Sequence, residues 1–177
     1  LLAGVEEPSV DSLIAVLAIA DATETDAGAI DRIRDLERLK AAAAAAQARI
    51  AAELLDRAEE AHAGRCAAQT GQAALAEEPW RRDPRGPVRS VAAQIALARR
   101  ESPHRGRELL GLARLLATDL PHLRRLVEDG QLSEHRALVI ATQLRDLPAA
   151  LRREADTRLA GPDADLPPAP TDGLTGT

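Results

Sequence analysis

The stretch that decides the fold is AIDRIRDLERLKAAAAAAQARIAAELLDRAEEAHAG, residues 29–64. Its apolar residues recur at steps of three and four from Ile30 onward, which is the spacing of one face of an α-helix. Six consecutive alanines, residues 41–46, continue the pattern with the best helix former. The stretch therefore predicts one long amphipathic helix over residues 29–63 that ends near Gly64 and forms the spine of the domain.

The composition of the whole chain also favours helices. Of 177 residues, 38 are Ala and 26 are Leu, whereas Val and Ile together number 14. Phe, Tyr, Met and Asn are absent, and Trp80 is the one aromatic residue. Since strands draw on β-branched and aromatic residues, these counts argue against a β-rich fold. We predict an all-α protein, an irregular bundle of about six or seven helices around the long one.

Proline, serine and glycine mark the ends of the other predicted helices. A short helix is expected from Ser9 to about Ala20, followed by a break from Thr23 to Gly28. An irregular connector is predicted over residues 64–87, with a helical stub near Ala73–Ala76. A further helix is expected from Val88 until Ser102-Pro103, which ends it and caps the next one. Three more are expected after Pro121, after the cap Ser133, and after Pro148.

Three regions follow from this punctuation. Residues 1–28 hold the short helix and the break, and residues 29–160 form the helical domain. Residues 161–177 are rich in Pro, Asp and Gly, which predicts a disordered tail or linker. Because the chain begins at Leu1 and ends in such a tail, we expect it to be a fragment of a longer protein.

Several classes of function lack the residues that they need. Cys66 stands alone and can form no internal disulfide, so a cytoplasmic location is expected. The longest apolar run, Leu13–Ala20, is eight residues, whereas a membrane span needs about 20. No phosphate-binding loop and no nucleophile elbow is present, so we predict no catalytic residue and no cofactor. His62 and Cys66 are four residues apart, but no second ligand pair follows, and no metal site is predicted.

The net charge of −5 conceals an uneven distribution. Residues 1–60 carry 13 acidic and six basic side chains, whereas residues 81–125 carry 11 arginines and four acids. Eight of these arginines lie close together in the sequence: Arg81, Arg82, Arg85, Arg89, Arg99, Arg100, Arg105 and Arg107. Such clustering is typical of a site for phosphate groups. The scarcity of aromatic residues argues against recognition of single strands or RNA, which leaves duplex DNA as the expected ligand.

A structural explanation for the arginine cluster is also open. The cluster can pair within the molecule with the acidic long helix, in which case it binds no nucleic acid. The observation that separates the two interpretations is whether the arginines lie on a surface free of Glu37, Glu53, Asp56 and Glu59.

A second feature is the segment from Pro121 to Ala137. A short helix, a turn containing Gly130 and a helix capped by Ser133 have the layout of a helix-turn-helix motif. The second helix would present Ser133, Glu134, Arg136 and Gln143 to a DNA groove. Any helical hairpin can show this layout, however, and Arg136 falls at a position where a helix-turn-helix motif calls for an apolar residue.

Four blocks of sequence, in this order, resemble one protein family. They are Asp31–Arg49, Val91–Gly106, Leu120–His122 and Gly130–Glu134. Together they resemble the actinobacterial domain of unknown function 222 family, also called the 13E12 repeat proteins, over about residues 29–160. The resemblance implies a helical N-terminal region, an association with mobile or repeated genetic elements and, in full-length members, a C-terminal HNH endonuclease domain.

The nuclease itself is not expected in this chain. An HNH site needs histidines and an asparagine, and this sequence contains no Asn. No catalytic residue is therefore carried over, and we predict no DNA cleavage by this chain. The leading hypothesis is a non-catalytic module that binds duplex DNA through its arginines. The alternative is a helical interaction or oligomerisation domain, for which the alanine-rich middle of the long helix offers a surface to a second copy. We favour packing of that surface into the core.

Overall fold

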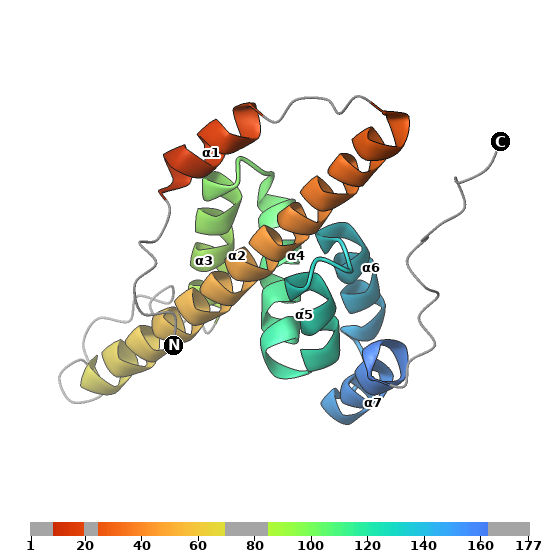
Figure 1. The fold of residues 1–177 in the computed structure, drawn as a ribbon. Coiled ribbons are helices and arrows are strands. Elements are labelled where there is room, and N and C mark those ends of the chain that lie inside the picture. The colour runs from red at the N-terminus through yellow and green to blue at the C-terminus, as the bar shows by residue number, and fades with distance from the viewer. Residues whose placement is uncertain (1–8, 20–24, 70–84, 163–177) are drawn as a thin grey trace, which may run out of the picture. The chain divides into compact units, whose positions relative to one another are not determined.

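The structure is a computed structural model that describes residues 9–19, 25–69 and 85–162. Within these ranges it contains seven α-helices and no strand (Figure 1). The prediction of an all-α fold with one long helix is therefore confirmed. The chain divides into two compact units, residues 1–35 and residues 36–177.

The first unit contains α1 (Val10–Ala18) and the first turns of α2 (Asp26–Gln69). The hydroxyl of Ser9 accepts a hydrogen bond from the backbone N–H of Ser12 at 3.1 Å, which confirms the predicted helix start. No residue of α1 is buried, and its five Val, Leu and Ile side chains are between 44% and 71% exposed.

The long helix α2 extends further at both ends than the sequence predicted. Its 44 residues begin at Asp26, because the hydroxyl of Thr25 accepts a hydrogen bond from the N–H of Gly28 at 3.2 Å and caps the first turn. The predicted end near Gly64 is wrong, since the helix continues to Gln69. Gly64 is exposed and has no neighbour near its Cα, so it costs the helix about 1 kcal/mol of propensity without breaking it.

This correction removes residues 64–69 from the predicted connector. The helical stub near Ala73–Ala76 and most of the predicted tail lie outside the described residues.

The second unit adds five shorter helices to the rest of α2. They are α3 (Gly86–Ala98), α4 (Pro103–Thr118), α5 (Pro121–Glu128), α6 (Glu134–Leu144) and α7 (Ala149–Ala160). Helices α3 and α4 form a hairpin, α5 and α6 pack on α4, and α7 packs on α5 (Figure 1). Four of these helices, α4 to α7, start where the sequence predicted, because Pro103 and Pro121 occupy first-turn positions, Ser102 and Ser133 cap α4 and α6, and Pro148 is the N-cap residue of α7.

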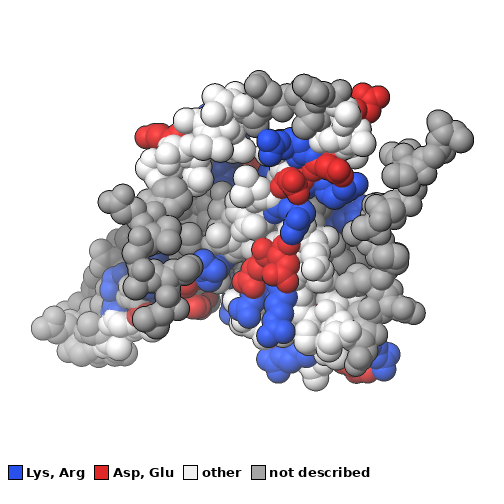
Figure 2. Space-filling model, viewed as in Figure 1, with Lys and Arg blue, Asp and Glu red and all other residues white. Residues whose placement is uncertain are grey.

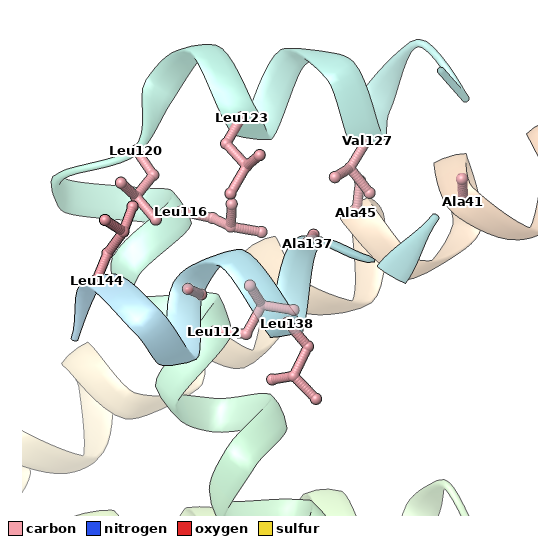
Figure 3. Close-up of a cluster of buried hydrophobic side chains, with 11 residues drawn as sticks. Ala41, Ala45, Leu112, Leu116, Leu120, Leu123, Val127, Ala137, Leu138 and Leu144 are labelled. Atoms are coloured by element: carbon pink, nitrogen blue, oxygen red, sulfur yellow. The ribbon is translucent and has the colours of Figure 1, made fainter. Parts of the chain in front are cut away.

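The buried face of α2 is made of alanines and of Leu55, which is 2% exposed. Ala41, Ala44, Ala45, Ala51 and Ala52 are each at most 8% exposed, so the predicted core-packing role of the alanine run is confirmed on this face. Ala41 and Ala45 contact a cluster built from α4, α5 and α6, in which Leu123 points toward Leu116 (Figure 3). Ala51 and Ala52 pack on Ala113 of α4 in a second cluster.

Two glycines are required by the close approach of helices. A Cβ atom at Gly106 would lie 2.4 Å from the carbonyl oxygen of Ala92, so α3 and α4 touch through backbone at this point. Gly130 has φ +72°, and a Cβ there would lie 2.8 Å from the side chain of Arg38 on α2. Glycine is the residue that tolerates both the conformation and the contact.

Two buried aspartates hold α7 in place. Asp119, at the end of α4, accepts hydrogen bonds from Arg152 at 2.6 and 2.8 Å and pairs with Arg153 at 3.0 Å. Asp156 of α7 accepts the backbone N–H groups of His122 and Leu123 at 2.8 and 2.9 Å. Because α5 has no side-chain cap of its own, Asp156 supplies this cap from another helix.

The contact at Gly106 yields a prediction about stability. Gly106→Ala should destabilise the protein by about 1–3 kcal/mol, because the new methyl group overlaps a backbone carbonyl. Gly111→Ala on the same helix should stabilise it by about 0.5–1 kcal/mol, because that position is exposed and without neighbours. Urea unfolding of the two variants measures both changes, and equal effects would contradict the described packing of α3 on α4.

Candidate nucleic-acid interface

The arginine-rich segment forms a tight corner between α3 and α4. Arg100 adopts φ +56°, and the N–H of Glu101 donates to the carbonyl of Ala96 at 2.8 Å, which is a Schellman ending of α3. The hydroxyl of Ser102 then accepts from the N–H of Arg105 at 3.1 Å and starts α4. The left-handed conformation of Arg100 costs about 1–2 kcal/mol in a residue with a side chain. Arg100 is an exposed residue.

A bidentate ion pair joins this corner to α6. The Nη1 and Nη2 atoms of Arg99 lie 2.6 and 2.9 Å from the two carboxylate oxygens of Glu134, which is 35 residues further along the chain. The side chains are 24% and 20% exposed. The hydrogen bond to Glu134 raises the pKa of Arg99 above its ordinary value, against the opposing effect of burial. Arg99 therefore keeps its charge throughout the neutral pH range.

The ion pair lies beside a polar hollow of about 440 Å³. The hollow is bounded by α2, by the α3–α4 corner and by the start of α6, and its charged or polar lining includes Lys40, Arg99, Arg105, Ser133, Glu134 and His135. Its α2 side is built partly from the small residues Ala41, Ala43 and Ala44. The cations are partly neutralised, since Lys40 pairs with Glu37 at 2.6 Å and Arg105 with Glu108 at 3.3 Å.

Helices α5 and α6 have the layout that the sequence predicted. The hydroxyl of Ser133 accepts from the N–H of Arg136 at 3.4 Å and is thus engaged in capping α6. Arg136 and Gln143 are exposed, whereas Ala137 and Ala141 face the core. Arg136 therefore does not occupy a position that packs into the core, and its charge disturbs no apolar contact. Glu134 is bonded to Arg99, so the expectation that it reaches into a groove needs correction.

The six arginines of the predicted cluster that the structure describes do not form one patch. Arg81 and Arg82 lie outside the described residues. Arg85 and Arg89 are exposed near the first turn of α3, whereas the other four lie at or beyond its last turn. A helix of 13 residues separates the two groups by about 20 Å. At the corner, Arg99 is ion-paired, Arg105 is half-buried, and Arg100 and Arg107 are exposed.

The acids of the long helix meet other cations. Glu59 lies 3.8 Å from Arg114, and Glu37 pairs with Lys40. Glu53 and Asp56 line a small hollow of about 120 Å³ together with Arg49 and Arg124. The partners of Arg99 and Arg105 are Glu134 and Glu108 instead. Glu37 nevertheless lines the same hollow as Arg99 and Arg105, so the surface at the corner is not free of the acids of the long helix, and both interpretations stay open.

Sequence reasoning missed Lys40 and His135, which line the hollow. Lys40 lies within the long helix predicted over residues 29–63, and no local spacing connects it with residues almost 60 or 100 positions away. The folded arrangement alone brings these side chains to one hollow.

The charge on the face shown in Figure 2 is mixed. Acidic and basic side chains of the described residues alternate there in small groups and form no broad field of one sign. A field of one sign would attract DNA over long distances, whereas alternating charges act at short range. Contacts of this face with a polyanion would therefore depend on individual exposed arginines.

The structure also places the pair of potential metal ligands that the sequence contains. His62 and Cys66 lie on one face of α2, with Nε2 and Sγ 3.6 Å apart, because the helix continues through Gly64. Among the described residues, no group of three His, Cys, Asp or Glu side chains could hold a metal ion. None of the described helices is both long and apolar enough to span a membrane.

Comparisons of the chain with protein-family models, with curated proteins and with solved structures found no match. The resemblance to the domain of unknown function 222 family thus stays a prediction from the sequence.

The link between the corner and α6 can be tested by a double-mutant cycle. Arg99→Ala and Glu134→Ala should each destabilise the protein, with a coupling energy of about 1–2 kcal/mol because the bidentate pair is largely shielded from water. The pair Arg158–Glu154 on α7 is 78% and 52% exposed and should couple by less than about 0.5 kcal/mol. Thermal or urea unfolding gives both values. Equal coupling in the two cycles would show that Arg99 and Glu134 do not fasten α3 to α6.

Proposed function

We propose that this chain is a non-catalytic module that binds duplex DNA, chiefly at backbone phosphates, through the α3–α4 corner and the exposed face of α6. The observation that carries the proposal is the ion pair between Arg99 and Glu134. This ion pair joins the α3–α4 corner to α6, the two segments that the sequence independently predicts to bind DNA. On the resemblance described above, such a module would precede an HNH endonuclease domain in a longer protein.

The exposed guanidinium groups of this region supply the contacts in the proposal. Arg100 and Arg107 belong to the corner and the first turns of α4, and Arg136 lies in the first turn of α6. Arginine matches phosphate through paired N–H donors, and the N-terminal turn of a helix adds a favourable dipole. Gln143, about two turns further along α6 than Arg136, offers an amide that can bond the edge of an adenine.

The number of free arginines sets the strength of binding. Three phosphate contacts give a slope of about −3 in a plot of log affinity against log salt, since each neutralised phosphate contributes about 0.9. The chain carries a net charge of −5, which repels DNA outside the interface. Binding in the micromolar range or weaker is therefore expected at physiological salt.

A pair of matched double variants tests the proposal. Arg100→Gly with Arg136→Ala removes two of the contacts, and glycine suits the left-handed conformation at position 100. Arg57→Ala with Arg65→Ala removes the same charge from exposed positions of α2. Fluorescence anisotropy of a labelled duplex over a range of salt concentrations should show the slope falling to about −1 in the first variant and staying near −3 in the second.

Two results would overturn the proposal. Equal weakening by both double variants would mean that net charge alone governs binding. Failure of the unsubstituted chain to bind the duplex at about 50 mM salt would remove the activity itself, since phosphate contacts are strongest at low salt.

A further inference from the structure

The exposed face of α6 is made of five side chains with different chemistry: His135, Arg136, Val139, Thr142 and Gln143. At about 100° per residue, these positions cover about one third of the helix circumference. They lie opposite the buried side chains of the same helix, which are Ala137, Leu138, Ala141 and Leu144. The face is therefore one continuous strip that no buried residue interrupts.

This face of α6 carries no acidic side chain. Glu134 is the one acid of the helix, and its two carboxylate oxygens are bonded to Arg99 at 2.6 and 2.9 Å. That ion pair is largely shielded from water, with the side chains 24% and 20% exposed. The charge that the face offers to a partner is therefore the positive charge of Arg136, which is complementary to a polyanionic duplex.

The middle of the face is apolar. Val139 is 48% exposed and lies one turn from Gln143. The hydroxyl of Thr142 donates to the carbonyl oxygen of Leu138 at 2.8 Å, so its proton is used within the helix and its methyl group is left for an apolar contact. Phosphate groups make no use of methyl groups, whereas the C5-methyl group of thymine in the major groove is an apolar partner for them.

We propose that the exposed face of α6 reads base pairs in the major groove and selects duplexes with A·T pairs at neighbouring positions. This inference rests on the proposed function, because it assigns base contacts to the same surface. The major groove admits an α-helix, and the amide of Gln143 matches the N6 and N7 groups of adenine. Val139 and Thr142 match the methyl group of thymine.

The spacing along the helix sets the spacing of the base pairs. Val139 and Gln143 are four residues apart and therefore about 6 Å apart along the helix axis. Successive base pairs are about 3.4 Å apart along the duplex. The two side chains thus reach base pairs about two steps apart at most, which predicts A·T pairs within about three consecutive positions.

Selection from a pool of duplexes with a randomised segment tests the preference, with the whole 177-residue chain as the selecting protein. The pool should become enriched in neighbouring A·T pairs. Affinity for an enriched duplex should fall about fourfold in Val139→Ala and about tenfold in Gln143→Ala, the effects of a lost methyl contact and of a lost bidentate contact. The salt slope should stay near about −3 in both variants, because neither loses a phosphate contact.

Uracil identifies the partner of Val139, because it lacks the methyl group of thymine and keeps the same hydrogen-bonding edge. Uracil should replace one enriched thymine at a time. At one position the unsubstituted chain should lose affinity about fourfold, whereas Val139→Ala should lose none. Leu151→Ala, which truncates a side chain that is 48% exposed on α7, should lose as much as the unsubstituted chain.

The outcomes separate this inference from the proposed function. Alanine is the better helix former, so circular dichroism should show that Val139→Ala keeps its helicity. Binding with a slope near about −3 but no enriched sequence would refute base readout and leave the phosphate contacts intact. Enrichment of G·C pairs, or a uracil effect that Val139→Ala retains at every position, would refute the A·T assignment. Absence of any binding at low salt would refute both proposals.

Discussion

The alanine face of α2 is the constraint on which the rest of the second unit depends. With Ala41, Ala44, Ala45, Ala51 and Ala52 buried, the shorter helices can approach α2 closely, but each contact removes little apolar surface from water. Close approach in turn requires glycine where backbone meets a neighbour, as at Gly130 beside Arg38. Hydrogen bonds and ion pairs between helices supplement these small apolar contacts. They set the position of α7 on α5 and of α3 beside α6.

Sequence predicted the features that depend on local chemistry. Periodicity and the caps Ser9, Ser102 and Ser133 located the helix starts, because a capping hydroxyl acts within three residues. The end of α2 was misjudged, since a single exposed glycine weakens a long helix by less than the helix gains from its other turns. The contact of Gly106 with Ala92 could not be foreseen, because it depends on the distance between two helices.

Only part of the candidate interface could be predicted from the sequence, for the same reason. Clustering of arginine along the chain is visible in the sequence, but the direction of each side chain is not. The fold sends Arg99 to Glu134 and leaves Arg100 exposed, although the two arginines are neighbours. It also brings Lys40 of α2 to the same hollow. A charged segment thus divides into residues that fasten helices together and residues that can meet a ligand.

The most direct measurement of the central claim is residue-level mapping of DNA contact. The amide NMR spectrum of the ¹⁵N-labelled chain should be recorded while a short duplex is added at low salt, where phosphate contacts are strong. We predict shifts confined to the α3–α4 corner and the exposed face of α6, with the signals of α7 unmoved. No shifts at all, or shifts spread along α2 with none at the corner, would contradict the account.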